Sequence, residues 1–197
     1  MAGIRDRFWQ TCTALGKNSW GYIKGMEYKL AHEVIEDLVD IVSKNGTLLL
    51  NVGPKPDGTI PPEDTELLLA IGKWLDVNGE AIYGTRPWVV YGEGPTEIQA
   101  GAFKDTERSA FTSQDFRFTT KPGVVFAIVM AAPTKNLEIR SLGSDLRLLS
   151  AKIDTVELLG SPHKIKWQQV GSGLKIELPE GVNLSEAAAF KCSYKTE

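Results

Sequence analysis

The sequence has no excess of charge of either sign and no long apolar run. It carries 22 Lys and Arg against 25 Asp and Glu, for a formal net charge of −3, and the basic residues are scattered among the acidic ones. This balance offers no basic surface to nucleic acid or to an anionic membrane. No segment approaches the roughly 18 apolar residues of a membrane span. We therefore expect a soluble chain whose partners include neither nucleic acid nor a membrane.

Cysteine and histidine are scarce. Cys12 and Cys192 lie near opposite ends of the sequence, which favours two free thiols, and no spacing typical of metal ligands occurs. His32 and His163 have no neighbour in the sequence that suggests catalysis, so we expect both at the surface. The opening residues, MAGIRDRFWQTC, lack the apolar segment of a secretory signal, and the compartment stays unknown.

The pattern up to about residue 88 is typical of an α/β fold. Apolar residues at four-residue spacing predict a core-facing helix over residues 27–44, which Asn45-Gly46 is expected to end. The apolar segment TLLLNV, residues 47–52, does not alternate, as is typical of a parallel strand covered by helices. Two prolines followed by acidic residues predict a helix over residues 62–77. The residues expected to be buried in the two helices are Leu30, Val34, Leu38 and Val42, then Leu67, Leu68, Ile71, Trp74 and Leu75.

From about residue 89 the pattern becomes all-β. Short runs such as DFRFTT, VVFAIVMA and LKIELP are separated by Gly, Pro, Asn or Ser, and several alternate between apolar and polar residues. This is typical of an antiparallel sandwich in which each sheet has one solvated face. We therefore predict α/β followed by all-β, with domains at residues 1–88 and 89–197. Trp88 and Trp167 are expected to pack the interdomain seam and the sandwich.

Several long motifs carry a family resemblance. SWGY at 19–22, LVDIVSKNGTLLLNVGPKPDGTIP at 38–61 and IGKWLDVNGEAIYGTRPW at 71–88 resemble the C-terminal part of family 29 glycoside hydrolases, the α-L-fucosidases. Later segments, including DFRFTT, VVFAIVM and IRSL, resemble the C-terminal β-sandwich of that family. The resemblance covers essentially the whole chain.

The resemblance implies a position for each element in a (β/α)₈-like barrel. TLLLNVGP is expected to be the last barrel strand, residues 62–77 the helix after it, and residues 1–46 the preceding strand, loop and helix. Active sites of such barrels lie at the carboxyl ends of the strands, so SWGY and NVGP are expected at the mouth of the site. A whole barrel needs about 250 residues, and only about 88 here have the barrel pattern.

The resemblance also implies a retaining mechanism with an Asp nucleophile and a second carboxylic acid, about 5 to 5.5 Å apart. The nucleophile and the fucose-binding histidines of the family belong to strands upstream of any segment in this sequence, so we expect no catalytic residue here. Gln10 stands where some relatives carry a Glu that has been proposed as the acid/base. An amide cannot deliver a proton, so either catalysis fails at this position or the acid of this branch lies upstream.

Two residues are candidates for substrate binding. The resemblance places Trp20 against the apolar face of the sugar, with a core Trp at a barrel seam as the alternative. Asn51, a polar residue at the end of an apolar strand, either orients the site loops or satisfies turn backbone. Asp57 is expected to form an Asx turn, and Asp37 and Asp40 are expected on a solvated flank of their helix.

The sequence thus predicts the C-terminal portion of an exo-acting retaining α-L-fucosidase, acting on terminal α-L-fucosyl linkages of a fucosylated glycan or glycoside without metal or organic cofactor. Alone, it is expected to be inactive. Its expected partner is the N-terminal barrel portion, in the same or a separate chain, or else a second copy. The alternative is a non-catalytic β-sandwich module that binds carbohydrate or is structural, which does not explain the preceding α/β segment.

Overall fold

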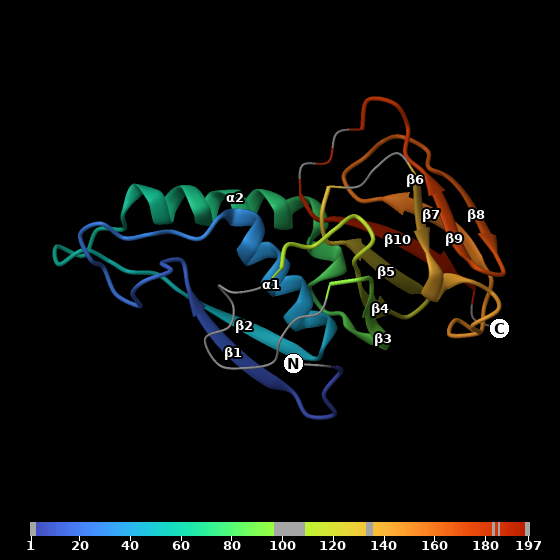
Figure 1. Ribbon diagram of the computed structural model, residues 1–197, viewed down its shortest axis with the longest axis horizontal. Helices are drawn as coiled ribbons and strands as arrows, with labels where there is room; N and C mark the ends of the chain where they lie inside the picture. Colours follow the sequence, from blue (N-terminus) through green and yellow to red (C-terminus); the bar gives the residue numbers. More distant parts are fainter. Residues whose placement is uncertain (1–2, 97–108, 133–135, 183, 185, 196–197) are drawn as a thin grey trace.

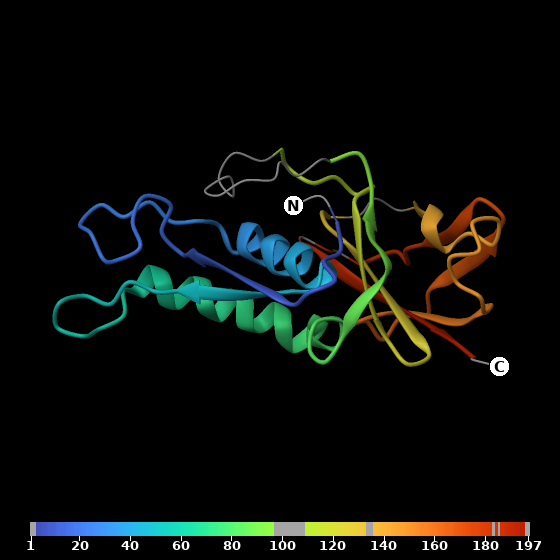
Figure 2. The ribbon, with the colours of Figure 1, turned by 90° about the horizontal axis from the view of Figure 1, so that it is seen from below.

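The computed structural model describes residues 3–96, 109–132, 136–182, 184 and 186–195. Helices and a small sheet form one end of the molecule, and two packed sheets form the other (Figures 1 and 2). In these described ranges, no helix combines the length and apolarity needed to cross a membrane.

The N-terminal part alternates strands and helices. β1 (Trp9–Ala14) and β2 (Gly46–Asn51) form a two-stranded parallel sheet, and α1 (Ala31–Ser43) connects them. α2 (Pro62–Asn78) follows β2. Both helices lie on the same side of this sheet (Figures 1 and 2), where Leu48 and Leu50 of β2 pack against the helical core. The expected strand between two helices is therefore confirmed.

The other face of this sheet is open in the described part of the chain. Because side chains alternate along a strand, Gln10, Cys12 and Leu49 point away from the helices, and all three are exposed, Leu49 by 54%. Among the described strands, β1 pairs only with β2 and β2 only with β1. Each strand thus keeps one edge without a partner strand in the described residues.

The ends of α1 differ from the prediction in physically clear ways. Leu30 is not part of the buried stripe: it precedes the helix, is 56% exposed, and donates its backbone N–H to the Glu33 carboxylate at 2.6 Å. At the other end, Asn45 takes the left-handed conformation with φ 72°, a role predicted for Gly46. Gly46 instead begins β2, where the Trp9 ring lies 2.6 Å from the position of an added Cβ.

α2 begins as predicted and covers residues 62–77 plus Asn78. Pro61 precedes the helix, Pro62 begins it, and Glu63 and Asp64 lie in its first turn. Ile71 and Trp74 are buried as expected. Leu68 was predicted to be buried and is not: it is 37% exposed beside Leu69, which is 60% exposed. The helix therefore carries apolar side chains on more than its core face.

Two antiparallel sheets follow, as the all-β pattern predicted. The first has the strand order β3 (Arg86–Glu93), β4 (Phe116–Lys121), β5 (Val124–Val129), β10 (Ala188–Tyr194) and β7 (Ile153–Leu158). The second has the order β6 (Asn136–Ile139), β9 (Gly173–Glu177) and β8 (Lys166–Val170). Short 3₁₀ helices, η1 (Gly79–Ala81) and η2 (Arg140–Leu142), follow α2 and β6.

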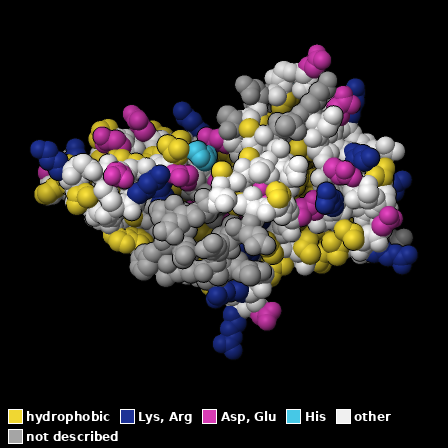
Figure 3. All heavy atoms as spheres, in the orientation of Figure 1, with side chains coloured by type: hydrophobic (Ala, Val, Ile, Leu, Met, Phe, Trp, Pro, Cys, Tyr) yellow, Lys and Arg dark blue, Asp and Glu magenta, His cyan; other side chains and the backbone are white. Residues whose placement is uncertain are grey.

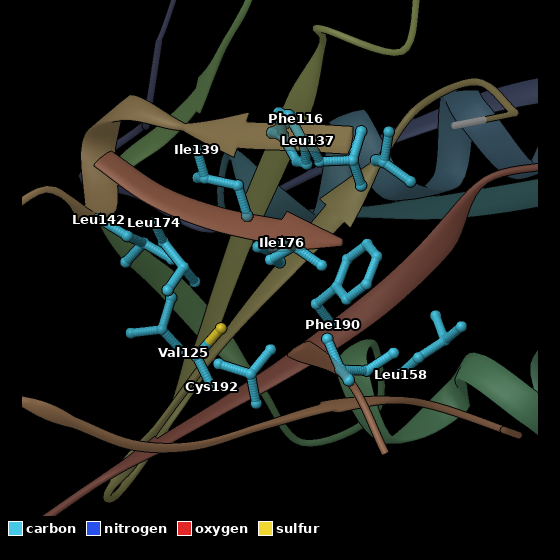
Figure 4. Packing of buried hydrophobic residues seen from close by; sticks show 14 of the residues in the cluster. Phe116, Val125, Leu137, Ile139, Leu142, Leu158, Leu174, Ile176, Phe190 and Cys192 are labelled. Carbon is cyan, nitrogen blue, oxygen red and sulfur yellow. The ribbon is translucent and has the colours of Figure 1, made fainter. Parts of the chain in front are cut away.

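The facing sides of the two sheets enclose one hydrophobic core. Phe116, Ile176 and Phe190 point into it from three strands (Figure 4), and all are at most 2% exposed. Trp88 also belongs to this core, where its ring meets Phe118 edge-on at 5.2 Å between centroids. Trp88 thus packs inside the sandwich and not at the seam with the helices, while Trp167 lies partly buried against the same core.

The opposite face of the first sheet packs against the helices. Phe126, Ile128 and Ala189 share a second core with Ile35 of α1 and Trp74 of α2. The Trp74 indole N–H donates to the Ala187 carbonyl at 2.6 Å. The Asn78 side-chain oxygen of α2 accepts the backbone N–H of Ala189 at 3.1 Å. This seam therefore combines apolar packing with satisfied polar groups.

A buried ion cluster also crosses the seam, and it corrects the prediction for Asp40. Asp40 is only 8% exposed and is not on a solvated flank, although neighbouring Asp37 is partly exposed. Its carboxylate contacts the Lys44 ammonium at 2.7 Å and the Arg117 Nε of β4 at 2.6 Å. Both cations also lie over the Tyr91 ring, Lys44 at 4.7 Å and Arg117 at 5.4 Å. The cluster ties α1 to β3 and β4.

Candidate functional site

Two loops project from the carboxyl ends of β1 and β2, at the left-hand end of Figures 1 and 2. They are residues 15–30, which contain the SWGY motif, and residues 52–61, which contain Val52, Gly53 and Pro54 of the NVGP motif. In a parallel α/β sheet, this is the end at which ligands bind. Figure 3 shows hydrophobic side chains at this end, next to acidic and basic ones.

The loop of residues 15–30 is closed at its base. Gly16 and Tyr28 form an antiparallel bridge, the Lys17 N–H donates to the Glu27 carbonyl at 2.7 Å, and the Lys29 N–H donates to the Leu15 carbonyl at 2.9 Å. The buried Lys29 ammonium also donates to the Thr13 hydroxyl at 2.5 Å. The loop therefore leaves β1 as a hairpin-like projection whose base is held by backbone hydrogen bonds.

The structure brings Trp20 and Asn51 together. The Asn51 amide group of β2 donates to the backbone carbonyl of Trp20 at 2.5 Å, across 31 residues of sequence. The Trp20 side chain is 48% exposed in this chain. Asn51 thus contacts the backbone of the loop through its amide, which fits both predicted alternatives, orienting the loop and satisfying backbone. The substrate-binding role of both residues stays a prediction.

The turn after Asn51 adds a contact that the sequence did not suggest. Gly53 lies against the loop so closely that an added Cβ would be 2.9 Å from the Tyr22 nitrogen and 3.2 Å from the Gly21 carbonyl carbon. The Gly53 N–H points to the Asp64 carboxylate at a long 3.4 Å. Burial raises the pKa of Asp64, which is 3% exposed, and neighbouring Glu63 adds to this, while the Gly53 N–H lowers it. In the sequence, Asp64 is visible only as one of the acidic residues at the start of α2.

The remaining candidates lie where no catalytic pair forms. Gln10 is exposed on the open face of β1 opposite Thr47, and its amide has no proton to deliver. His32 and His163 are exposed, as predicted. Asp57 forms the predicted Asx turn, accepting the Thr59 N–H at 3.0 Å. Among the described residues, no cluster of His, Cys, Asp and Glu could hold a metal ion.

Comparisons with known proteins agree across nearly the whole chain. Residues 1–80 match the family model described as alpha-L-fucosidase, and residues 109–193 match that of the alpha-L-fucosidase C-terminal domain. Tissue alpha-L-fucosidase of Bos taurus is 37% identical over 182 residues, which is 90% of this chain and 34% of the relative. Plasma alpha-L-fucosidase of Homo sapiens is 33% identical over 178 residues, again 34% of the relative.

The fold is similar to solved structures of the same kind. An alpha-fucosidase of Thermotoga maritima, solved in complex with fucose, superimposes with a TM-score of 0.74 at 31% identity. The match covers 96% of this chain and 40% of the Thermotoga chain. The chain thus spans about a third of the length of the curated relatives and matches their C-terminal part.

Proposed function

Because the chain belongs to the α-L-fucosidase family of glycoside hydrolases, we propose that it forms the C-terminal part of an exo-acting retaining α-L-fucosidase. In this proposal, residues 1–88 supply the last two strand–helix units of a (β/α)₈-like barrel and residues 89–197 its β-sandwich. The substrate is a terminal α-L-fucosyl group of a glycan or glycoside. The observation that carries the proposal is the pair of parallel strands whose carboxyl ends present Trp20 on a loop held by Asn51.

The contribution of this chain to the reaction is substrate binding. The Trp20 ring offers a flat apolar surface to the apolar face of the fucose ring, and Asn51 holds the backbone from which that ring projects. Retaining hydrolysis proceeds by attack of a carboxylate on the anomeric carbon and protonation of the leaving oxygen by a second carboxylic acid. We assign both carboxyl groups to the barrel strands that precede this segment in the family. The chain alone is therefore proposed to be inactive.

The open sheet face supports docking with those strands. Each of β1 and β2 has one edge without a partner among the described strands, and the exposed Leu49 lies on the face that a closed barrel would cover. Burying apolar surface contributes roughly 25 cal/mol per Å², so a few hundred Å² gives several kcal/mol. We propose the N-terminal barrel portion, within one chain or as a separate one, as the partner of this surface.

A chimera tests the proposal. Residues 1–197 replace the matched 40% of the Thermotoga enzyme, and hydrolysis of an aryl α-L-fucoside is measured for the chimera and for the isolated chain. We expect multiple turnovers from the chimera and none from the chain above a heat-killed control. Replacing Trp20 by alanine in the chimera should raise KM. A folded chimera without activity, or turnover by the chain alone, would contradict the proposal.

A further inference from the structure

The backbone of the Trp20 loop is held at its tip as well as at its base. Within the loop, the Ser19 hydroxyl accepts the Gly21 N–H at 3.2 Å, and the Asn18 side chain accepts the Glu27 N–H at 3.2 Å. From outside the loop, Asn51 donates to the Trp20 carbonyl. A loop whose tip is bonded to a strand loses less conformational entropy when it binds a ligand, because part of that ordering is already present in the free protein.

Gly53 makes close packing between the turn and the loop possible. Its φ lies outside the left-handed region, so its own backbone conformation does not require glycine. What requires glycine is space, because an added Cβ would meet the Tyr22 nitrogen at 2.9 Å, closer than Cβ atoms in proteins approach other atoms. The three nearest atoms, from Gly21 and Tyr22, all belong to backbone, so the loop as a whole would have to move away.

Asp64 supports the turn through a hydrogen bond. Asp64 is buried, and its carboxylate accepts the Gly53 N–H at 3.4 Å. Asp64 lies in the first turn of α2. The helix therefore helps to fix the position of the turn, and the turn helps to fix the position of the loop. The three residues thus form a continuous support between a rigid helix and the exposed Trp20.

We propose that Asn51, Gly53 and Asp64 are positioning residues that set the Trp20 loop in its sugar-binding conformation before the sugar arrives. This inference rests on the proposed function, since it assigns the loop to sugar binding. It deepens that function because it makes sugar specificity depend on a turn that positions the Trp20 loop without contacting the substrate itself. Because the support lies wholly within this chain, the isolated chain already holds the loop in place.

The first test uses the isolated chain and needs no activity. Hydrogen exchange followed by mass spectrometry compares the wild type with Asn51→Asp, which keeps the side-chain shape but has no N–H to donate. We expect the amides of residues 18–24 to exchange about fivefold faster, as loss of one hydrogen bond predicts. The amides of Lys17 and Lys29 at the loop base should not change. Unchanged exchange at residues 18–24 would overturn the inference.

The second test measures kinetics in the chimera. Gly53→Ala should raise KM for the aryl fucoside at least about fivefold with a smaller change in kcat, because the displaced loop weakens binding more than chemistry. Gly72→Ala is the matched control, since Gly72 lies in α2 with open space at its Cβ position, and it should leave both constants unchanged. Asp64→Asn, which still accepts a hydrogen bond, should approach the wild type, whereas Asp64→Ala should resemble Gly53→Ala.

The outcomes separate this inference from the proposed function. An inactive wild-type chimera would count against the proposed function and leave the hydrogen-exchange result as the test of the support. An active chimera in which Gly53→Ala and Asn51→Asp keep the wild-type KM would overturn the inference alone. If Gly53→Ala fails to fold, as judged by circular dichroism, Asn51→Asp provides the same comparison without added volume.

Discussion

The two regions of the molecule differ in how they cover their sheets. In residues 86–195, the two sheets face each other and enclose a core in which Phe116, Phe118 and Phe190 are fully buried. In residues 9–78, a sheet of only two strands is covered by helices on one side, and the other side exposes Leu49, Gln10 and Cys12. A sheet this small needs packing against other elements to persist. The helical region therefore depends on the seam with the sandwich, whereas the sandwich core is complete by itself.

The two free cysteines give the sharpest comparison of the regions. Cys12 is exposed on the open sheet face, and Cys192 is buried in the sandwich core, where burial raises its pKa to about 12. At pH 8 only about one Cys192 thiol in ten thousand is then ionised, and the thiolate is the reactive form. We expect an aromatic disulfide reagent to modify the Cys12 thiol rapidly and the Cys192 thiol only after the protein unfolds. In Cys12→Ser, rapid modification should vanish; two rapid thiols in the native wild type would show that the sandwich is open.

The buried ion cluster tests whether the seam couples the regions. Asp40→Ala leaves Lys44 and Arg117 buried without their carboxylate, and we expect a loss of about 3 to 5 kcal/mol in the free energy of unfolding. Urea denaturation of the wild type and the variant measures this loss in the free energy of unfolding. Asp154→Ala is the control, because Asp154 and Lys195 form an exposed pair at 3.9 Å, and such pairs contribute about 0 to 1 kcal/mol. Equal losses in the two variants would mean that the cluster does not hold α1 to the sandwich.

Association should distinguish the open face from the closed region. We expect the isolated chain to self-associate through the β1–β2 sheet in light scattering coupled to size-exclusion chromatography. Leu49→Lys should weaken the association about 10- to 100-fold, as expected from losing one buried leucine. Val89→Lys, at a 61% exposed position on β3, should have no effect. A monomer across a wide concentration range would contradict the expectation.

The smallest expected difference is in pH dependence. Burial raises the pKa of Asp115, but four hydrogen bonds from Thr112 and Thr96 outweigh it and hold the pKa below its ordinary 3.8. Asp115 therefore stabilises the fold above about pH 4, and this contribution is lost as the pH falls through its lowered pKa. Asp64 contributes with the opposite sign, because burial raises its pKa. Its ionised form lowers the stability of the fold, and this loss is relieved as the pH falls through the raised pKa.

Urea unfolding between pH 6 and pH 3 separates the two carboxyl groups. Asp115→Asn should flatten the decline below pH 4, and Asp64→Asn should give a small gain near pH 6. If both variants lost stability at pH 6 and kept the wild-type slope below pH 4, the signs assigned to the two groups would be wrong.

Local patterns in the sequence predicted most of the secondary structure. The Asx turn at Asp57, the start of α2 after Pro61 and the alternation of the later strands each depend on a few neighbouring residues. The prediction that Leu30 and Leu68 are buried was wrong. Helical spacing shows which residues share a face, but it does not show how far the elements that cover that face extend. The domain boundary at residue 88 stays a proposal.

Contacts between distant residues could not be predicted in this way. Asp40 was predicted to be solvated because it lies on the flank of its helix, and its partner Arg117 lies 77 residues away in the sequence. The contact from Asn51 to Trp20 spans 31 residues. Gly53 carries no signal as a single glycine in a turn, and only the position of the loop beside it shows why a side chain would not fit.

The position of β10 in the first sheet has a consequence for synthesis on the ribosome. β10 lies between β5 and β7, yet its residues 188–194 follow those of every other described strand in the sequence. It also brings Ala187 and Ala189 to Trp74 and Asn78 of α2. A nascent chain can therefore form its early strand–helix units and hairpins in order, but neither the sheet nor the seam can close until this segment has emerged. Cotranslational folding should be late and abrupt, and a stop codon before residue 187 should leave exposed apolar surface for chaperones to bind.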